Sequence, residues 1–404
     1  MAQQATTANA NGPIWGGADN GVVSTTAERR ALYLKLFSGE MFKGFQRNTI
    51  ARDLVTRRTL KNGKSLQFIF TGRTKAEFHV PGQSILGNDE KSPPVAEKTI
   101  QCDALLISSA FVYELDETLA HYDLRGEISR KIGYALAENY DRRIFRAITK
   151  AARQPSAITM ANFKEPGGSI VKVGAANSTT ANDCYDPTKL VTAFYEAAAI
   201  LDEKGVSGEG RVAVLNPRQY YELIKGVGGS GSGAYLINRD EQGSALQSGN
   251  GIIEIAGIRI YKSMNIPFLG DYGVNLGNLP SDAVSNINEA ASKGSFIGED
   301  MDDMDASTTP SGQKTVNNYG TAAKFGGSCG LIFQKEAAGV VEAIGPQVQV
   351  TSGDVSVVYQ GDVILGRLAM GADFLNPAAA VELVAGIDVS ANWNNTAVSN
   401  ASFT

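Results

Sequence analysis

Residues 111–153 read FVYELDETLAHYDLRGEISRKIGYALAENYDRRIFRAITKAAR, and this stretch decides the fold. From about Leu124 onward, apolar side chains recur every three to four residues, as on one face of an α-helix. That stripe comprises Ile128, Ile132, Leu136, Tyr140, Ile144 and Ile148, with Ala135, Phe145 and Ala147 beside it. The pattern predicts a helix of roughly 28 residues, about 42 Å long. Because this is more than twice the length of an average globular helix, we expect the other segments to be built on it.

The opposite side of the predicted helix is charged. Its residues are Arg130, Lys131, Glu138, Arg142 and Arg143. An amphipathic helix of this kind buries one face and turns the other toward water or a partner.

The composition is that of a large globular protein. The chain has 404 residues, of which 43% are hydrophobic and 20% charged, and these values predict two or three domains with a sizeable core. The net charge of −5 argues against nucleic acid as a major ligand.

Cysteine spacing and the N-terminal sequence indicate a cytosolic chain. Cys102, Cys184 and Cys329 are widely separated, form no CxxC pair and fit a reducing compartment. The N-terminus, MAQQATTANANGP, has neither the basic nor the apolar region of a secretory signal. No apolar run approaches 18 residues, so no membrane-spanning helix is expected.

The segments before the long helix are predicted to reach outward. Residues 1–27 are small and polar and are predicted to form a mobile arm, whereas residues 26–44 carry apolar side chains that we expect to dock on something, such as another chain. Residues 59–109 are predicted to form a long hairpin, with strands over 65–72 and 97–109. A two-stranded hairpin is not stable alone in water, so it must lie on another surface. The alternative is two strands of an ordinary sheet joined by a long loop.

The segments after the long helix predict an α+β or α/β unit. Residues 153–185 are predicted as loops or short edge strands. A helix starts at Asp186-Pro187 and stops before Gly205, a strand covers 211–215, and a second helix starts at Asn216-Pro217. One or two strands kinked at Gly257 are expected over 252–263.

The C-terminal part is predicted to return to strands. Residues 264–328 are irregular and include the acidic run EDMDDMD at 299–305. Strands are predicted over 328–334, 339–350, 354–359 and 363–374, with turns at Ser352-Gly353 and Gly361-Asp362. The tail after Gly386 is polar.

No catalytic or cofactor motif in the sequence is complete. Gly63-Lys64-Ser65 lacks the earlier glycine of a phosphate-binding loop, and the glycine-rich run 226–233 lacks the setting of a dinucleotide site. The acids at 300–305 break the calcium-loop pattern, so a solvated loop is favoured over a metal site. We therefore expect no cofactor and no metal, and the pattern favours a structural protein over an enzyme.

Five stretches together resemble a known family. They are LYLKLFSGEMFKGF at 32–45, GKSLQFIFTGRTKAEFHVPG at 63–82, EKTIQCDALL at 97–106, ELDETLAHYDLRGE at 114–127 and ILGRLAMGADFLNPAAAVEL at 364–383. They are similar to tailed-phage major capsid proteins with the HK97-like fold, closest to those of T7-like podoviruses. The resemblance covers most of the chain, with 265–325 and the tail beyond Leu383 least alike.

The resemblance implies an α+β fold divided into named parts. These are an N-terminal arm at 1–58, an extended E-loop at 59–109, a P-domain spine helix at 110–152, an inserted A-domain at 153–338, P-domain strands at 339–384 and a C-terminal tail at 385–404. The implied function is an icosahedral shell of pentamers and hexamers that encloses double-stranded DNA without recognising its sequence. The implied partners are other copies of the chain, a separate scaffolding protein, a portal protein and, in some relatives, decoration proteins. The implied place is the virion, after assembly in the host cytoplasm.

Two sets of residues are predicted to serve assembly. Contacts between subunits are expected at Leu34, Phe37, Phe42, Arg73, Phe78, Val80, Ile85 and Leu86. A loop near the capsomer axis is expected at Gly226, Gly228, Gly229, Gly231, Gly233 and Tyr235, because a glycine run can adopt the different paths that rings of five and six require. Two alternatives remain: an encapsulin-like compartment shell, which shares the fold, and an enzyme with a site of scattered carboxylates.

Overall fold

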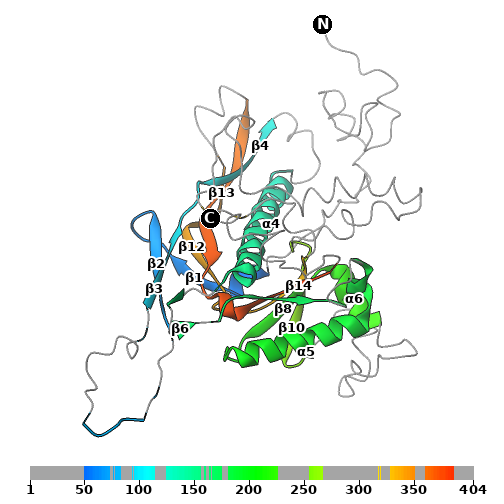
Figure 1. The fold of residues 1–404 in the computed structure, drawn as a ribbon. Coiled ribbons are helices and arrows are strands. Elements are labelled where there is room, and N and C mark those ends of the chain that lie inside the picture. Colours follow the sequence, from blue (N-terminus) through cyan, green and yellow to red (C-terminus); the bar gives the residue numbers. More distant parts are fainter. Residues whose placement is uncertain are drawn as a thin grey trace. The chain divides into compact units, whose positions relative to one another are not determined.

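The computed structural model describes about half of the chain. The described residues are 50–72, 76, 78–82, 93, 95–113, 124–155, 159–160, 163–164, 166–174, 181–225, 254–266, 317, 319, 328–350 and 360–385. They divide between two compact units, and α4 (Leu124–Arg153), β12 (Ala338–Val350) and β13 (Gly361–Phe374) each contribute to both. Figure 1 shows these elements along the chain.

A six-stranded mixed sheet forms the centre of the larger unit. Its order is β7-β14-β11-β8-β10-β9. The strands are β7 (Ser169–Lys172), β14 (Ala380–Val384), β11 (Ser328–Gln334), β8 (Arg211–Leu215), β10 (Ile258–Lys262) and β9 (Glu254–Ile255). β14 is parallel to β7 and β10 is parallel to β8, whereas β11 is antiparallel to both of its neighbours. The predictions for β8 and β11 are confirmed to the residue.

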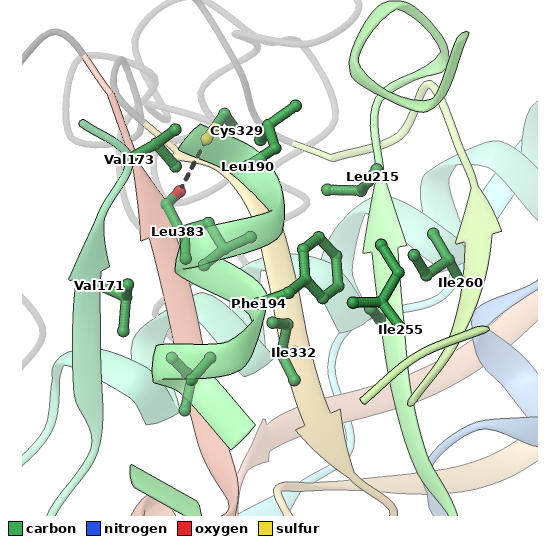
Figure 2. Packing of buried hydrophobic residues seen from close by; sticks show 14 of the residues in the cluster. Val171, Val173, Leu190, Phe194, Leu215, Ile255, Ile260, Cys329, Ile332 and Leu383 are labelled. Atoms are coloured by element: carbon green, nitrogen blue, oxygen red, sulfur yellow. Dashed lines mark hydrogen bonds between the residues drawn. The ribbon is translucent and has the colours of Figure 1, made fainter. Parts of the chain in front are cut away.

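Helix α5 (Pro187–Glu203) covers one face of this sheet (Figure 1). Asp186 caps it by accepting a hydrogen bond from the Thr188 amide at 3.0 Å, and Gly205 has φ +68° just after it, as the sequence predicted. Phe194 is fully buried in one apolar cluster with side chains of the sheet, including Leu215, Ile255 and Ile332 (Figure 2). α6 (Pro217–Lys225) adds Tyr220 and Leu223 to the same apolar cluster.

The kink predicted at Gly257 is a hairpin turn. Ala256 and Gly257 have φ of 53° and 72°, and they connect β9 to the antiparallel β10. Positive φ at both central residues is typical of the tight turn that matches strand twist.

Helix α4 has 30 residues and starts at Leu124, as predicted. The charged side was expected to face water or a partner; in the C-terminal half it does not face water, because every residue from Tyr140 to Arg153 is buried, including Arg142 and Arg143. Ala135, which was predicted to lie in the buried stripe, is exposed. The helix is therefore enclosed rather than amphipathic near its C-terminus.

In the smaller unit, β4 (Leu106–Tyr113) is antiparallel to β13 over Gly361–Leu368. Val112 packs against Ile132 and Leu136 of α4. A Cβ on Gly366 would lie too close to methyl groups of the same two side chains, so an alanine here would require them to shift.

Two strand predictions are wrong. The return strand predicted over 97–109 ends at Gln101 in β3 (Val95–Gln101), because β2 (Ser65–Thr71) supplies no partner beyond Ser65, and 106–113 instead form β4. The turn predicted at Gly361-Asp362 is also displaced: Gln360 has φ 54° and β13 begins at Gly361. The strand predicted over 354–359 and the turn at Ser352-Gly353 lie outside the described residues.

The remaining elements are short. β1 (Thr56–Thr59) follows the 3₁₀ turn η2 (Ala51–Asp53) and pairs with β12 in parallel. β5 (Thr159–Met160) and β6 (Phe163–Lys164) form a two-residue ladder, and η4 (Ala181–Tyr185) and η9 (Pro377–Ala379) are single turns.

Candidate assembly surface

The β2–β3 hairpin has one packed face and one face in water. The register pairs Ile69 with Glu97 and Thr71 with Val95, and strand alternation places these four residues on the outer face. Ile69 is 75% exposed and Val95 is 64% exposed. They are diagonal neighbours in the antiparallel ladder, close enough to form one apolar spot.

Apolar exposure continues beyond the paired part of the hairpin. Phe78 is fully exposed and Val80 is 56% exposed. These are the two predicted contact residues that the structure describes. The other six, Leu34, Phe37, Phe42, Arg73, Ile85 and Leu86, lie outside the described residues, as do the predicted axis-loop residues 226–235.

The inner face of the hairpin packs on its own chain. Phe68 and Ile100 are buried with Val341 of β12, and Leu60, Leu66 and Leu375 pack around them. The Arg58 guanidinium lies 4.8 Å from the centre of the Phe68 ring, within the range of a cation–π contact. The root of the hairpin therefore belongs to the subunit core, although its outer face does not.

A shared carboxylate joins this root to α4. Asp373 of β13 forms ion pairs with Lys98 of β3 at 2.8 Å and with Lys150 of α4 at 3.1 Å. Both ammonium groups also lie near the Phe374 ring. Hairpin, helix and sheet meet at one acidic side chain.

Asp103 follows β3 and forms a second buried junction. It pairs with Arg143 of α4 at 3.2 Å and accepts hydrogen bonds from the Asn317 amide and side chain at 3.1 and 3.0 Å. The Tyr319 hydroxyl donates to Asp103 at 2.6 Å and accepts from the Ala372 amide at 3.0 Å. Burial, together with the charge of Asp103, raises the pKa of Tyr319 well above its usual value.

Glu342 of β12 forms a third junction. Arg52 donates two hydrogen bonds to it at 3.2 and 3.1 Å, and the Tyr140 hydroxyl donates one at 2.6 Å. Burial alone would raise the pKa of Glu342, but the hydrogen bonds from Arg52 and Tyr140 outweigh it, so its pKa lies below the usual value. Burial and the Glu342 contact raise the pKa of Tyr140.

At its C-terminal end, α4 makes a fully enclosed ion pair. Both nitrogens of the Arg153 fork lie 2.5 Å from the two oxygens of Glu382, and both side chains are at most 1% exposed. A paired, parallel geometry of this kind fixes the orientation of both groups.

The smaller unit has an apolar sheet face of its own. On β4, Ile107, Phe111 and Tyr113 alternate with the residues that pack on α4, and they are 41%, 51% and 40% exposed. The register places Val363 opposite Phe111 and Arg367 opposite Ile107. We call the outer side of this strand pair the β4–β13 outer face.

The three buried carboxylates were not predicted from the sequence. Asp103, Glu342 and Glu382 were not singled out, and the charged face of α4 was expected to meet water or a partner. A signal was present: Glu342 and Glu382 are lone acids within the apolar strands GVVEAI and AVELV. A charge at such a position requires a buried partner.

Nothing in the described part of the chain points to metal chemistry or to a membrane. No group of three or more His, Cys, Asp or Glu side chains among these residues is arranged to hold a metal ion. No helix within the described ranges is long and apolar enough to cross a membrane. The acids at 300–305 lie outside those ranges.

Comparison with protein families gives one match over most of the chain. A family model described as "Gp10A-like: Major capsid protein" matches residues 68–384. The major capsid protein of Enterobacteria phage T3 is 24% identical over 381 residues, which cover 93% of this chain and 98% of that protein. The major capsid protein of Escherichia phage T7 is 28% identical over 225 residues, which cover 55% of this chain and 64% of that protein.

Solved structures agree. The capsid structure of the cyanophage P-SCSP1u is similar with a TM-score of 0.63 and 29% sequence identity, over 90% of this chain and 95% of that chain. The mature capsid of bacteriophage PhiM1 is similar with a TM-score of 0.55 and 15% identity, over 92% and 95% of the two chains, and so supports the fold alone. The predicted mixed helix-and-sheet capsid fold is confirmed at this level.

Proposed function

This chain belongs to the Gp10A-like major capsid protein family, and from that premise we propose how it builds a shell. It is a major capsid protein of a tailed phage, which is a structural protein class rather than an enzyme class. The encapsulin-like alternative is not favoured, because the matched family and the similar structures are phage capsids.

The finer assignment is a closed shell of pentamers and hexamers around double-stranded DNA. In it, residues 59–109 act as an E-loop on a neighbouring subunit, and the arm, P-domain, A-domain and tail have the bounds expected from the sequence. Assembly in the host cytoplasm requires a separate scaffolding protein, and a portal protein occupies one vertex. Loop 226–233 lies near the capsomer axis.

One observation carries this proposal: the hairpin is anchored at its root and apolar on its outer face. Phe68, Ile100 and Lys98 tie the root to the subunit, whereas Ile69, Phe78, Val80 and Val95 remain in water in the single chain. Exposed apolar side chains that follow one another along a projecting element are typical of a protein–protein contact.

We assign the β4–β13 outer face of a neighbouring copy as the surface that receives the hairpin. It offers Ile107, Phe111 and Tyr113 to the apolar residues of the hairpin. The two surfaces carry charges of opposite sign beside their apolar residues. On the hairpin, Glu97 is the cross-strand neighbour of Ile69, and on the β4–β13 outer face, Arg367 is the cross-strand neighbour of Ile107.

Cysteine cross-linking tests this contact. The three native cysteines are buried, so Val80→Cys with Phe111→Cys would add the exposed thiols of the pair. We expect dimers and longer covalent chains only when the doubly substituted protein is assembled with scaffolding protein. Val80→Cys with Tyr195→Cys, an exposed residue of α5, is the matched control.

The outcome separates the two levels of the proposal. Shells without Val80–Phe111 cross-links would contradict the receiving surface alone. Stable monomers in sedimentation, with scaffolding protein present, would contradict the shell-forming function itself.

A further inference from the structure

Asp141 occupies an unusual place on α4. Its side chain is fully buried, and its two oxygens accept hydrogen bonds from the Ile50 amide at 2.9 Å and the Ala51 amide at 3.3 Å. These amides begin η2, so Asp141 caps this turn from about ninety residues away. The Asn265 side chain also donates a hydrogen bond to it.

The same carboxyl therefore holds two places that are far apart in the sequence, the start of η2 and Asn265. Asn265 is itself buried, and its amide is held by the Ser263 hydroxyl at 3.2 Å. Release of Asp141 would loosen both places together.

Among the described residues, no ion pair neutralises Asp141. On η2, Arg52 pairs with Glu342, and Asp53 is the remaining charged group. On α4, Arg142 pairs with Glu138 and Arg143 with Asp103. On the third element, Lys262 contacts the Tyr221 hydroxyl, and residues 263–266 carry no charge.

We propose that Asp141 acts as a pH-sensitive latch, which holds the Ile50–Ala51 amides and the Asn265 side chain against α4. The latch opens locally when the carboxyl becomes hydrated. η2 is a single turn, and the amides at its start donate to Asp141 of α4, so loss of these two bonds would first release this turn. The inference concerns the isolated subunit and does not depend on the proposed shell contacts.

The direction of the pH effect follows from burial. Burial raises the pKa of Asp141 to about 7, against opposing contributions from the Ile50, Ala51 and Asn265 hydrogen bonds. A hydrated carboxyl has a pKa near 3.9, so the open form loses its proton more readily than the closed form. The closed form is therefore favoured at acid pH, and its advantage is lost as pH rises toward about 7.

Hydrogen exchange of the isolated full-length chain tests the latch. After correction for intrinsic exchange rates, the opening constant of the Ile50 and Ala51 amides should rise about 50-fold between pH 5 and pH 7, and only about twofold more by pH 8. Asp141→Asn cannot ionise, so its corrected opening constant should not change with pH. Asp186→Asn is the matched control, because Asp186 also accepts a backbone amide but is exposed at its position before α5.

If Asp141→Asn does not fold, the pH dependence of the wild-type opening constant still tests the proposal. A corrected opening constant that is flat from pH 5 to pH 8 would overturn the proposal. So would an Asp141→Asn variant that keeps the wild-type pH dependence.

Discussion

The two faces of the six-stranded sheet are held in different ways. On one face, α5 packs through a cluster in which Phe194, Leu190 and Leu201 are fully buried. On the other face, strand alternation turns Glu382 away from that cluster, and it pairs with Arg153 of α4. Apolar burial depends on area and not on direction, whereas a paired arginine and carboxylate must meet in one geometry. The apolar side should therefore supply stability, and the charged side should fix where α4 lies.

The largest effect is expected on the apolar side. Phe194→Ala should reduce the free energy of unfolding by about 3–5 kcal/mol, because it removes a fully buried ring and leaves a cavity. Urea unfolding of the isolated chain, followed by circular dichroism, measures it. The neighbouring Tyr195 is 56% exposed, so Tyr195→Ala should stay within about 0.5 kcal/mol of wild type. Equal losses for the two variants would contradict the assignment of this core.

On the charged side, stability should depend on whether each buried charge keeps its partner, and not on how much apolar area is buried. Glu382→Leu leaves Arg153 buried without its carboxylate and should cost about 3 kcal/mol. Arg153→Met combined with Glu382→Leu should recover most of that loss, since no buried charge remains. The same unfolding measurement applies. A double variant less stable than Glu382→Leu would show that the pair itself is a net source of stability.

A glycine on the apolar side of the six-stranded sheet, Gly330 of β11, can be compared with Gly371 of β13, which lies beside the Asp103 network. A Cβ on Gly371 would collide with the backbone oxygen of Gln101 and lie 2.9 Å from the side-chain nitrogen of Asn317. A Cβ on Gly330 would meet mainly the side-chain ends of Leu215 and Leu383. Side-chain ends can move, but a backbone carbonyl held in the Asp103 network cannot. We expect Gly371→Ala to cost about 2 kcal/mol more than Gly330→Ala. Thermal unfolding of both variants gives the difference, and a larger loss at Gly330 would refute the argument.

The smallest effect concerns pH. The pKa of Glu342 lies below its usual value, so this carboxylate stabilises the fold above the ordinary glutamate range and loses that effect as pH falls through its own pKa. The stability difference between wild type and Glu342→Gln should be about 1 kcal/mol at pH 6, since Arg52 is partly exposed, and should shrink toward pH 3. Unfolding at pH 6, 4 and 3 tests this. A stability difference that does not change with pH would show that ionisation of Glu342 does not stabilise the fold.

Local signals predicted the apolar side well. Asp186-Pro187 and Gly205 delimit α5, and the runs at 211–215 and 328–334 are strands to the residue. These signals lie within a few residues of the elements that they delimit, so a single sequence contains them. The resemblance to capsid proteins supplied the fold class for the same reason, since it rests on contiguous stretches.

The charged side and the assembly surface were harder to predict. Arg153 and Glu382 are 229 residues apart, and Tyr140 and Glu342 are 202 apart, so neither partner is visible from the other. Asp103, the partner of Arg143, lies 40 residues away and is likewise not visible from it, whereas Glu138 lies four residues before Arg142. Phe78 and Val80 were predicted as contacts between subunits and are exposed in the single chain. Ile107, Phe111 and Tyr113 were not singled out, because their exposure depends on the pairing of β4 with β13.

The position of β14 has a consequence for biosynthesis. β14 is the last described strand, yet it lies between β7 and β11, which begin about 210 and 50 residues earlier in the chain. At roughly 5–20 residues per second, a ribosome needs about 20–80 s to reach that strand. Until then, the edges of β7 and β11 that β14 will join are open to other chains, and such non-local closure is slow and prone to aggregation. The six-stranded sheet is therefore complete only after β14 has been synthesised, and a chain terminated before that strand cannot close it.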